Sequence, residues 1–400
     1  MPAFKAKNIR LMQESKGEQW TREHLSEALE SGQLKPSDFS IRDLFEQLVP
    51  DGTELIRSFS PMKSGGFVPI SEASEAVHSS AFANVSGQIL FTQIMAEATL
   101  ETFVFTPLIP VVPTQFSSEK IGGIANLSDE NLVVPEGADF PIVGMNEDWL
   151  ETPNTLKRGA RIALTREAIF FDRTGLILDR ARSIGITLGS NKEKRAIDAV
   201  VDENTTAHRH NYRGKVIASY GDNSGNHDFD NLAASNGLLD YTDIDAAEQL
   251  ATAITDRNTG EPMPVMLDTL IVTPELRATA YRIMSATTIA LQVGGFAVTG
   301  NMPRTDSPSP IGRHQYSAAY SVLSSRLLDA RLTAASEPTS SWYLANIGMA
   351  VEYRQNWPLE VRQLQNGDDD FQRDIPVQYR VDEMGAFFVK DPRYLVKSTA

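Results

Sequence analysis

Histidines and carboxylates suited to metal binding gather in the stretch 208–231, "HRHNYRGKVIASYGDNSGNHDFDN". His208 and His210 stand two residues apart, so a strand would present both on one face. Together with Asp228 they could hold the metal ion of a hydrolase. The spacing fixes no third ligand, however, and polar loop histidines are the simpler interpretation. We therefore predict no metal site.

The other short patterns that carry known chemistry are missing from this sequence. It has no G-x-S-x-G elbow, no P-loop and no dinucleotide-binding fingerprint. The stretch "DNSGNHDFD" (222–230) lacks the closing Glu of a calcium-binding loop, and "GDDDFQRD" (367–374) is typical of a solvated turn. The absence of cysteine excludes thiolate catalysis, disulfides and Cys-based zinc sites. We predict a protein that is not an enzyme and uses no cofactor.

The length and charge of the chain indicate how many subdomains it has and which partners it is unsuited to bind. A chain of 400 residues is long enough for two subdomains with buried cores. Its formal net charge of −15 argues against nucleic-acid binding by the whole surface, because phosphate recognition requires clustered Lys and Arg. No apolar run approaches the roughly 18 residues that span a bilayer, and the charged N-terminus lacks a secretory h-region. We expect a soluble intracellular chain.

The N-terminal part is predicted to be helical, and the part after it is predicted to form a hairpin that projects from the body of the protein. Ser40 and Asp43 have the spacing of a capping box at the start of a helix. Further on, "EKIGGIANLS" (119–128) and "KRGARIALT" (157–165) suit two strands joined by a long acidic segment. A lone hairpin is only marginally stable in water, so this projection should need a partner surface. The predicted helices before it are 21–32, 40–52 and 86–104.

Residues 165–202 are predicted to form one long helix. Apolar side chains recur at helical spacing in this stretch, and Arg166, Arg173 and Arg180 recur every seven residues on another face. A helix of this length would extend about 57 Å. Each helical glycine weakens it by about 1 kcal/mol relative to alanine, so we expect a bend or break near 185–190.

The remainder of the chain is predicted to be mixed α/β, followed by antiparallel strands. "MLDTLIVTP" (266–274) has the composition of a buried strand, and the stretch 294–315 is predicted to be a mobile loop. In the C-terminal region apolar and polar residues alternate, and "DEMG" (382–385) is predicted as a hairpin turn. The other predicted elements here are helices at 243–256 and 274–286 and strands at 318–328 and 341–347.

The order of these segments resembles the major capsid proteins of tailed double-stranded DNA bacteriophages, in particular Mu-like and prophage head subunits. The segments that carry the resemblance are "LKRGARIALTREAIFFDRTGLILDRARSIGITLGSNKEKRAIDAVV" (156–201), "LDTLIVTPELRATA" (267–280) and "FQRDIPVQYRVDEMGAFFVKDPRYLVKSTA" (371–400). The resemblance implies an α+β chain with the HK97-like fold. It assigns 1–105 to an N-terminal helical arm, 106–164 to an extended E-loop hairpin and its flanks, 165–241 to the spine helix and loop of a peripheral domain, 242–345 to an axial domain, and 346–400 to peripheral-domain strands.

The same resemblance implies a function. Copies of the chain would assemble as pentamers and hexamers into an icosahedral shell around phage DNA, in the host bacterial cytoplasm, and remain in the virion. Scaffold, portal and decoration proteins are the implied partners, with weak non-specific contact to packaged DNA and none to a membrane. An encapsulin-type compartment shell is the alternative, although encapsulins are usually shorter and lack so long an N-terminal region.

Candidate inter-subunit contacts combine the hairpin with the arginines that follow it. The acidic hairpin of one copy is expected to meet arginines of a neighbour. One relative crosslinks its subunits through a Lys–Asn bond, for which Lys120 with Asn356 or Asn366 are candidates, although ordinary surface residues are the simpler interpretation. The predicted contact residues are Lys120, Glu136, Asp139, Glu147, Asp148, Arg158, Arg161, Arg166, Arg173 and Arg180.

Reversing the charge of Arg173 tests this electrostatic pairing. Replacing Arg173 by Glu should place like charges opposite each other and so impair assembly. Negative-stain particle counts at matched protein concentration would measure the effect. A normal particle yield from Arg173→Glu would contradict the pairing.

Overall fold

The computed structural model describes most of the chain from residue 72 onward and shorter stretches before it. The described residues are 9, 11–12, 15–31, 33–36, 39–48, 72–99, 102–123, 134, 136–137, 149–201, 210–223, 229–256, 260–285, 288–290, 306–308, 320–365 and 377–399.

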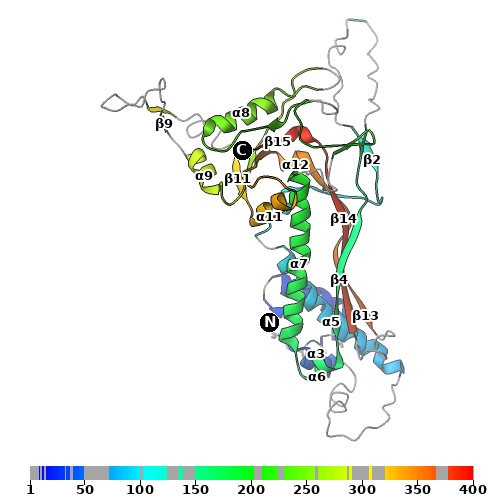
Figure 1. Cartoon of the computed structure of the whole chain (residues 1–400). Coiled ribbons are helices and arrows are strands. Elements are labelled where there is room, and N and C mark those ends of the chain that lie inside the picture. Colours follow the sequence, from blue (N-terminus) through cyan, green and yellow to red (C-terminus); the bar gives the residue numbers. More distant parts are fainter. Residues whose placement is uncertain are drawn as a thin grey trace, which may run out of the picture. The chain divides into compact units, whose positions relative to one another are not determined.

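The chain folds into two compact units, each assembled from segments that are far apart in the sequence (Figure 1). Helix α7 (Thr174–Val201) and strands β13 (Val351–Gln365) and β14 (Val377–Val389) contribute residues to both units. Unit 1 comprises Met1–Glu101, Lys157–Asn191 and Trp357–Met384, and unit 2 comprises Thr102–Leu156, Lys192–Asn356 and Gly385–Ala400.

The helices of unit 1 confirm the predicted N-terminal helices with shifted bounds. The predicted capping residue Ser40 accepts a hydrogen bond from the Asp43 amide, at 3.2 Å. The third helix begins earlier than predicted and ends before residue 99. The N-terminal helices are α2 (Glu18–Glu30), α3 (Ile41–Leu48) and α5 (Glu72–Ala98).

The single helix predicted over 165–202 is wrong in its first part. Helix α6 (Arg166–Phe170) ends before α7 begins, and Asp172 between them has a φ of 46°. The Thr174 hydroxyl donates to the Asp172 carboxylate at 2.6 Å and accepts from the Ile41 amide at 2.8 Å. A contact with the N-terminal helices therefore fixes the break between α6 and α7. Because of this break, Arg166, Arg173 and Arg180 do not lie on one continuous helix as predicted.

The predicted bend near 185–190 is also wrong, because α7 is continuous through Gly185. Gly185 lies against helix α5, and a Cβ at this position would lie 2.5 Å from the Ile94 carbonyl oxygen. Figure 1 shows this part of α7 running beside α5. The Arg182 Nε atom bonds the Glu97 carboxylate at 2.9 Å, one turn from the crossing. The glycine therefore permits close helix packing instead of breaking the helix.

A sheet with strand order β1-β13-β14-β4 contributes strands to both units. Strand β14 runs without interruption through Asp382–Gly385, so the predicted turn at "DEMG" is wrong. Strand β4 (Leu156–Leu164) confirms the strand predicted at 157–165, but it lies at the sheet edge beside β14, and within the described part of the chain it does not pair with residues 119–123. Pairing with segments far away in the sequence therefore decides both the continuity of β14 and the position of β4.

The core of unit 1 lies between its helices and the strands of this sheet. The Ser86 hydroxyl of α5 lies 2.6 Å from the Tyr379 phenol oxygen of β14, and burial raises the pKa of that phenol. Fully buried apolar side chains from both elements surround this pair. Its fully buried members include Leu25, Leu44, Leu90, Ile94, Leu164 and Tyr379.

Unit 2 contains a five-stranded sheet of order β11-β8-β12-β15-β7, flanked by helices (Figure 1). Strand β8 (Thr269–Val272) confirms the predicted buried strand, since all four of its residues are buried. Helix α8 (Tyr241–Thr252) begins with a capping box formed by Asp240 and Asp243. The other elements are β7 (Leu232–Ala233), α9 (Arg277–Ser285), β11 (Ser321–Ser324), α11 (Arg326–Ala334), β12 (Trp342–Ala345), α12 (Ile347–Ala350), η3 (Pro392–Tyr394) and β15 (Leu395–Ser398).

A smaller sheet of unit 2 forms the base of the predicted hairpin. Strand β2 (Lys120–Gly122) pairs antiparallel with β3 (Trp149–Glu151), which corrects the predicted pairing of 119–128 with 157–165. Strands β5 (His210–Tyr212) and β6 (Lys215–Ile217) complete the order β2-β3-β5-β6. Most of the predicted loop 294–315 lies outside the described residues. The remaining elements are η2 (Thr106–Leu108), β1 (Val111–Pro113), β9 (Thr288–Ala290) and β10 (Asp306–Pro308).

Replacing Gly185 by Ala tests the close approach of α5 and α7. The added methyl group would meet the Ile94 carbonyl, so we expect a loss of about 1–3 kcal/mol in unfolding free energy from overpacking. Gly175 lies in the same helix, and a Cβ added there would meet no atom within 4 Å, which makes Gly175→Ala the matched control. Urea unfolding of the two variants should separate them, and equal midpoints would contradict the packing argument.

Candidate functional site

A buried carboxylate fixes the start of unit 2 against α7. Glu193 is fully buried and accepts hydrogen bonds from the amides of Val104, Phe105 and Thr106 at 2.8, 2.8 and 2.9 Å. The Thr106 hydroxyl adds a fourth hydrogen bond at 2.6 Å. Four donors replace the water that this carboxylate loses on burial, so the segment before β1 is held in one position.

The basic cluster at the end of α7 is engaged within unit 2. The Lys192 ammonium lies 4.4 Å from the centre of the Tyr353 ring, and the Arg195 guanidinium lies 5.6 Å from that of Phe387. The Arg331 side chain binds the Asp198 carboxylate through two nitrogens, one of them at 2.7 Å. These cations therefore stabilise the subunit by cation–π and ionic contacts.

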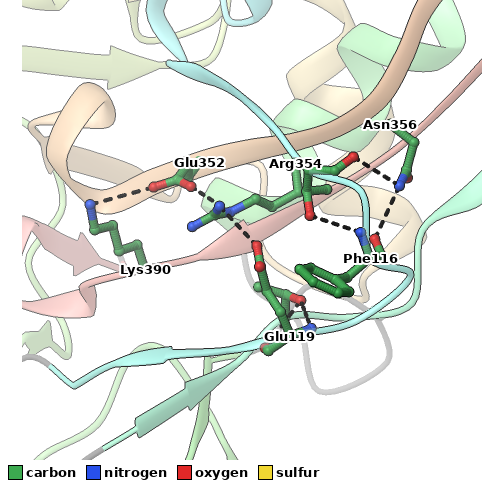
Figure 2. Close-up of polar contacts among 8 residues, drawn as sticks. Phe116, Glu119, Glu352, Arg354, Asn356 and Lys390 are labelled. Atoms are coloured by element: carbon green, nitrogen blue, oxygen red, sulfur yellow. Dashed lines mark hydrogen bonds and ion pairs between the residues drawn. The ribbon is translucent and has the colours of Figure 1, made fainter.

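A chain of charges on β13 holds the segment that leads into β2 (Figure 2). The Arg354 guanidinium forms ion pairs with the Glu119 carboxylate at 2.9 Å and with the Glu352 carboxylate at 2.6 Å. Lys390 completes the chain at 3.4 Å from Glu352. One guanidinium thus bridges an acid on its own strand and an acid at the base of the hairpin, which fixes the position of the base.

The amide of Asn356 clamps the backbone next to this charge chain. It donates to the carbonyl oxygens of Thr114 and Phe116 at 3.2 and 3.0 Å, as Figure 2 shows. The Thr114 amide donates to the Gln355 carbonyl at 2.9 Å. The backbone around Phe116 is therefore fixed, while the Phe116 side chain is 62% exposed.

Hydrogen bonds also join the two arms of the hairpin base. The Thr155 amide donates to the Ser117 carbonyl at 2.8 Å, and the Thr152 amide donates to the Glu119 carbonyl at 3.0 Å. The Glu119 amide donates in turn to the Thr152 hydroxyl at 2.9 Å. The segments that precede and follow residues 123–148 in the chain thus form one fixed base.

The predicted contact residues fall into three groups. Lys120 is engaged within its own sheet, 3.4 Å from the Glu151 carboxylate and 4.9 Å from the centre of the Trp149 ring. The exposed residues are Glu136, Arg161, Arg173 and Arg180, whereas Arg158 is half-buried. The Arg173 guanidinium lies 5.5 Å from the centre of the Phe171 ring. Asp139, Glu147, Asp148 and the Arg166 side chain lie outside the described residues.

The candidate metal-binding residues lie outside the described part of the chain, namely His208, Asp228 and the His210 side chain. No group of three potential metal ligands occurs among the described residues. Likewise, none of the described helices has the length and apolar composition needed to cross a membrane.

Of the crosslink candidates, Asn356 serves as the backbone clamp, and Asn366 is not described.

Opposite charges also fix the carboxylate of Asp382 in unit 1. Lys157 lies 3.1 Å from one of its oxygens and Arg380 lies 2.9 Å from the other. Burial by itself would raise the pKa of the Asp382 carboxyl, but the hydrogen bonds from Lys157 and Arg380 outweigh it and hold the pKa below its usual range. This ion cluster holds β4 against β14 where the turn was predicted.

Sequence reasoning missed the residues on which the hairpin base depends. Glu352 and Arg354 are two apart on a strand, a spacing that places opposite charges on one face and could have identified the pair. Glu193 stands in the basic run "NKEKR" (191–195) without any local signal of burial. Asn356 carries no signal either, because its partners lie about 240 residues away, at Thr114 and Phe116.

Comparisons with known proteins give one family and a set of similar structures. A family model described as phage capsid protein matches residues 150–398. No curated protein has a matching sequence. Similar solved structures include a virus-like particle from Pyrococcus furiosus (11% identity, TM-score 0.43, 77% of this chain and 96% of that chain), the capsid of the cyanophage P-SCSP1u (12%, 0.43, 74% and 88%) and the mature capsid of bacteriophage PhiM1 (12%, 0.43, 85% and 90%).

Replacing Glu193 by Gln tests the buried carboxylate. Glutamine offers one acceptor oxygen and turns an NH2 group toward backbone donors, so we expect a loss of about 2–3 kcal/mol in unfolding free energy. Asp179→Asn on the exposed face of the same helix should cost at most about 0.5 kcal/mol. Urea unfolding measures both, and a neutral Glu193→Gln would rule out the proposed role of the charge.

Proposed function

The chain belongs to the phage capsid protein family, and we propose that its copies form pentamers and hexamers of an icosahedral shell that encloses double-stranded phage DNA. Membership makes it a shell-forming structural subunit of the virion capsid that associates with copies of itself. The family match over 150–398 is the observation that carries this conclusion. It spans the hairpin strand β3, helix α7 and the C-terminal strands.

The hairpin base supports a particular way of assembling. Two short strands, β2 and β3, belong to the fixed base, and residues 123–148 between them carry many acidic side chains. We propose that this E-loop lies on a neighbouring copy, whose surface supplies contacts that two short strands cannot supply alone. Exposed arginines such as Arg173 and Arg180 are candidate partners for its acids.

The same proposal assigns the remaining parts and partners. Residues 242–345 would form the axial domain near the centre of each capsomer, and 165–241 with 346–400 the peripheral domain. Scaffold, portal and decoration proteins would join the subunit in the host bacterial cytoplasm. Contact with packaged DNA would be weak, because the net charge of −15 repels phosphate and the α7 cluster 192–195 is partly engaged by aromatic rings.

Expression of the chain alone, followed by negative-stain imaging and light scattering, tests the proposed function. We expect capsomers or closed shells, because each subunit repeats several modest contacts that reinforce one another. Particles from a phage-producing host should contain DNA. A compartment shell would instead contain protein cargo, and a chain that stays monomeric at every concentration would overturn the proposal.

A further inference from the structure

We propose that Phe116 is an aromatic anchor that each subunit inserts into a second copy of this chain in the assembled shell. This inference rests on the proposed function and adds a specific contact residue to it. Phe116 lies at the hairpin base and outside all the residues that the sequence singled out for subunit contacts. Its side chain is 62% exposed, and its ring is not needed to complete the core of its own unit.

The backbone that carries this ring is held from several sides. Asn356 binds the carbonyl oxygens of Thr114 and Phe116, and the Phe116 amide donates to the Thr114 hydroxyl at 3.2 Å. The carbonyl of the next residue, Ser117, accepts from Thr155 at 2.8 Å. A ring presented from a fixed backbone loses little conformational entropy on binding, which is the property of an effective anchor.

A second exposed apolar residue follows a residue that is hydrogen-bonded within the hairpin base. Leu156 follows Thr155, whose amide binds the Ser117 carbonyl, and it is 57% exposed. The Glu119–Arg354 ion pair fixes the chain that leads into β2. Exposed apolar side chains on a fixed polar support suit the centre of a protein interface, where aromatic residues are enriched and a few residues contribute most of the binding energy.

The occupant that fits this anchor is another copy of the chain. The subunit belongs to a shell-forming family, and Phe116 precedes strand β2, which leads into the E-loop that the proposed function places on a neighbour. Base stacking on DNA is disfavoured, since the whole chain carries a formal net charge of −15. The contact of an apolar ring with a second copy depends on an apolar surface and not on a charged residue of that copy.

Three variants separate an anchor from a structural residue. Phe116→Ser should raise the protein concentration needed for assembly at least about tenfold, since burial of one large apolar side chain changes association by that order. Phe116→Trp should assemble within about threefold of the original chain, because an aromatic ring is retained. Leu239→Ser is the matched control, as Leu239 is 77% exposed in the same unit and distant in sequence from the hairpin base. Light scattering and negative-stain counts measure all three.

Thermal unfolding of the unassembled Phe116→Ser subunit should match that of the original chain, because the replaced ring is exposed. Equal assembly of Phe116→Ser and the original chain would overturn the anchor and leave the proposed function intact. An equal loss in Leu239→Ser would also overturn the special role of Phe116, since any exposed apolar side chain of the unit would then serve as well as the ring held at the hairpin base. If the original chain forms no assembly at all, both the proposed function and the anchor fall.

The absence of cysteine allows a direct measurement at the same position. Phe116→Cys gives a chain with a single thiol, whose reaction with a maleimide reports access to residue 116. We expect the reaction to slow at least about tenfold in shells relative to unassembled subunits, as a buried contact excludes the reagent. Equal rates in the two states, or protection that appears only when DNA is packaged, would overturn contact with a second copy.

Discussion

The fold of unit 2 depends first on the burial of one carboxylate. Glu193 has no cation beside it among its described partners and is stabilised by four hydrogen bonds from residues 104–106. Those bonds place the chain so that β1 can pair in parallel with residues 353–355 of β13. Strand β13 then presents Arg354 and Asn356 to the hairpin base. A single buried charge on a helix thus fixes the segment that leads to the hairpin base.

Several cations of unit 2 are engaged by partners within the subunit. Lys192 and Arg195 lie over aromatic rings, Arg331 binds Asp198, and Arg354 bridges two acids. Cations used in this way are not available as a continuous phosphate-binding surface. This arrangement agrees with a shell protein whose net negative charge limits its affinity for nucleic acid while specific surfaces mediate assembly.

Much of what distinguishes the fold from its sequence-based prediction comes from close approach between distant segments. Gly185 lets α7 pass the backbone of α5, where a side chain would meet the Ile94 carbonyl. Gly385 similarly makes room for the Tyr353 side chain, so "DEMG" continues a strand instead of turning. In both cases a residue that usually signals a break or a turn serves tight packing, because the neighbouring element leaves no space for a Cβ.

The sequence by itself determined the elements whose signals are local. The N-cap at Ser40, the apolar run of β8 and the helical arm could be predicted because neighbouring residues stabilise them. It also determined the order of segments on which the capsid resemblance rests. The tertiary structure alone decided the break before α7, the partner of β4 and the network of Glu193, Arg354 and Asn356. Each of these depends on residues far away in the chain. The packing of whole elements decides which hydrogen-bonding partner a buried polar group meets, and its sequence neighbours do not.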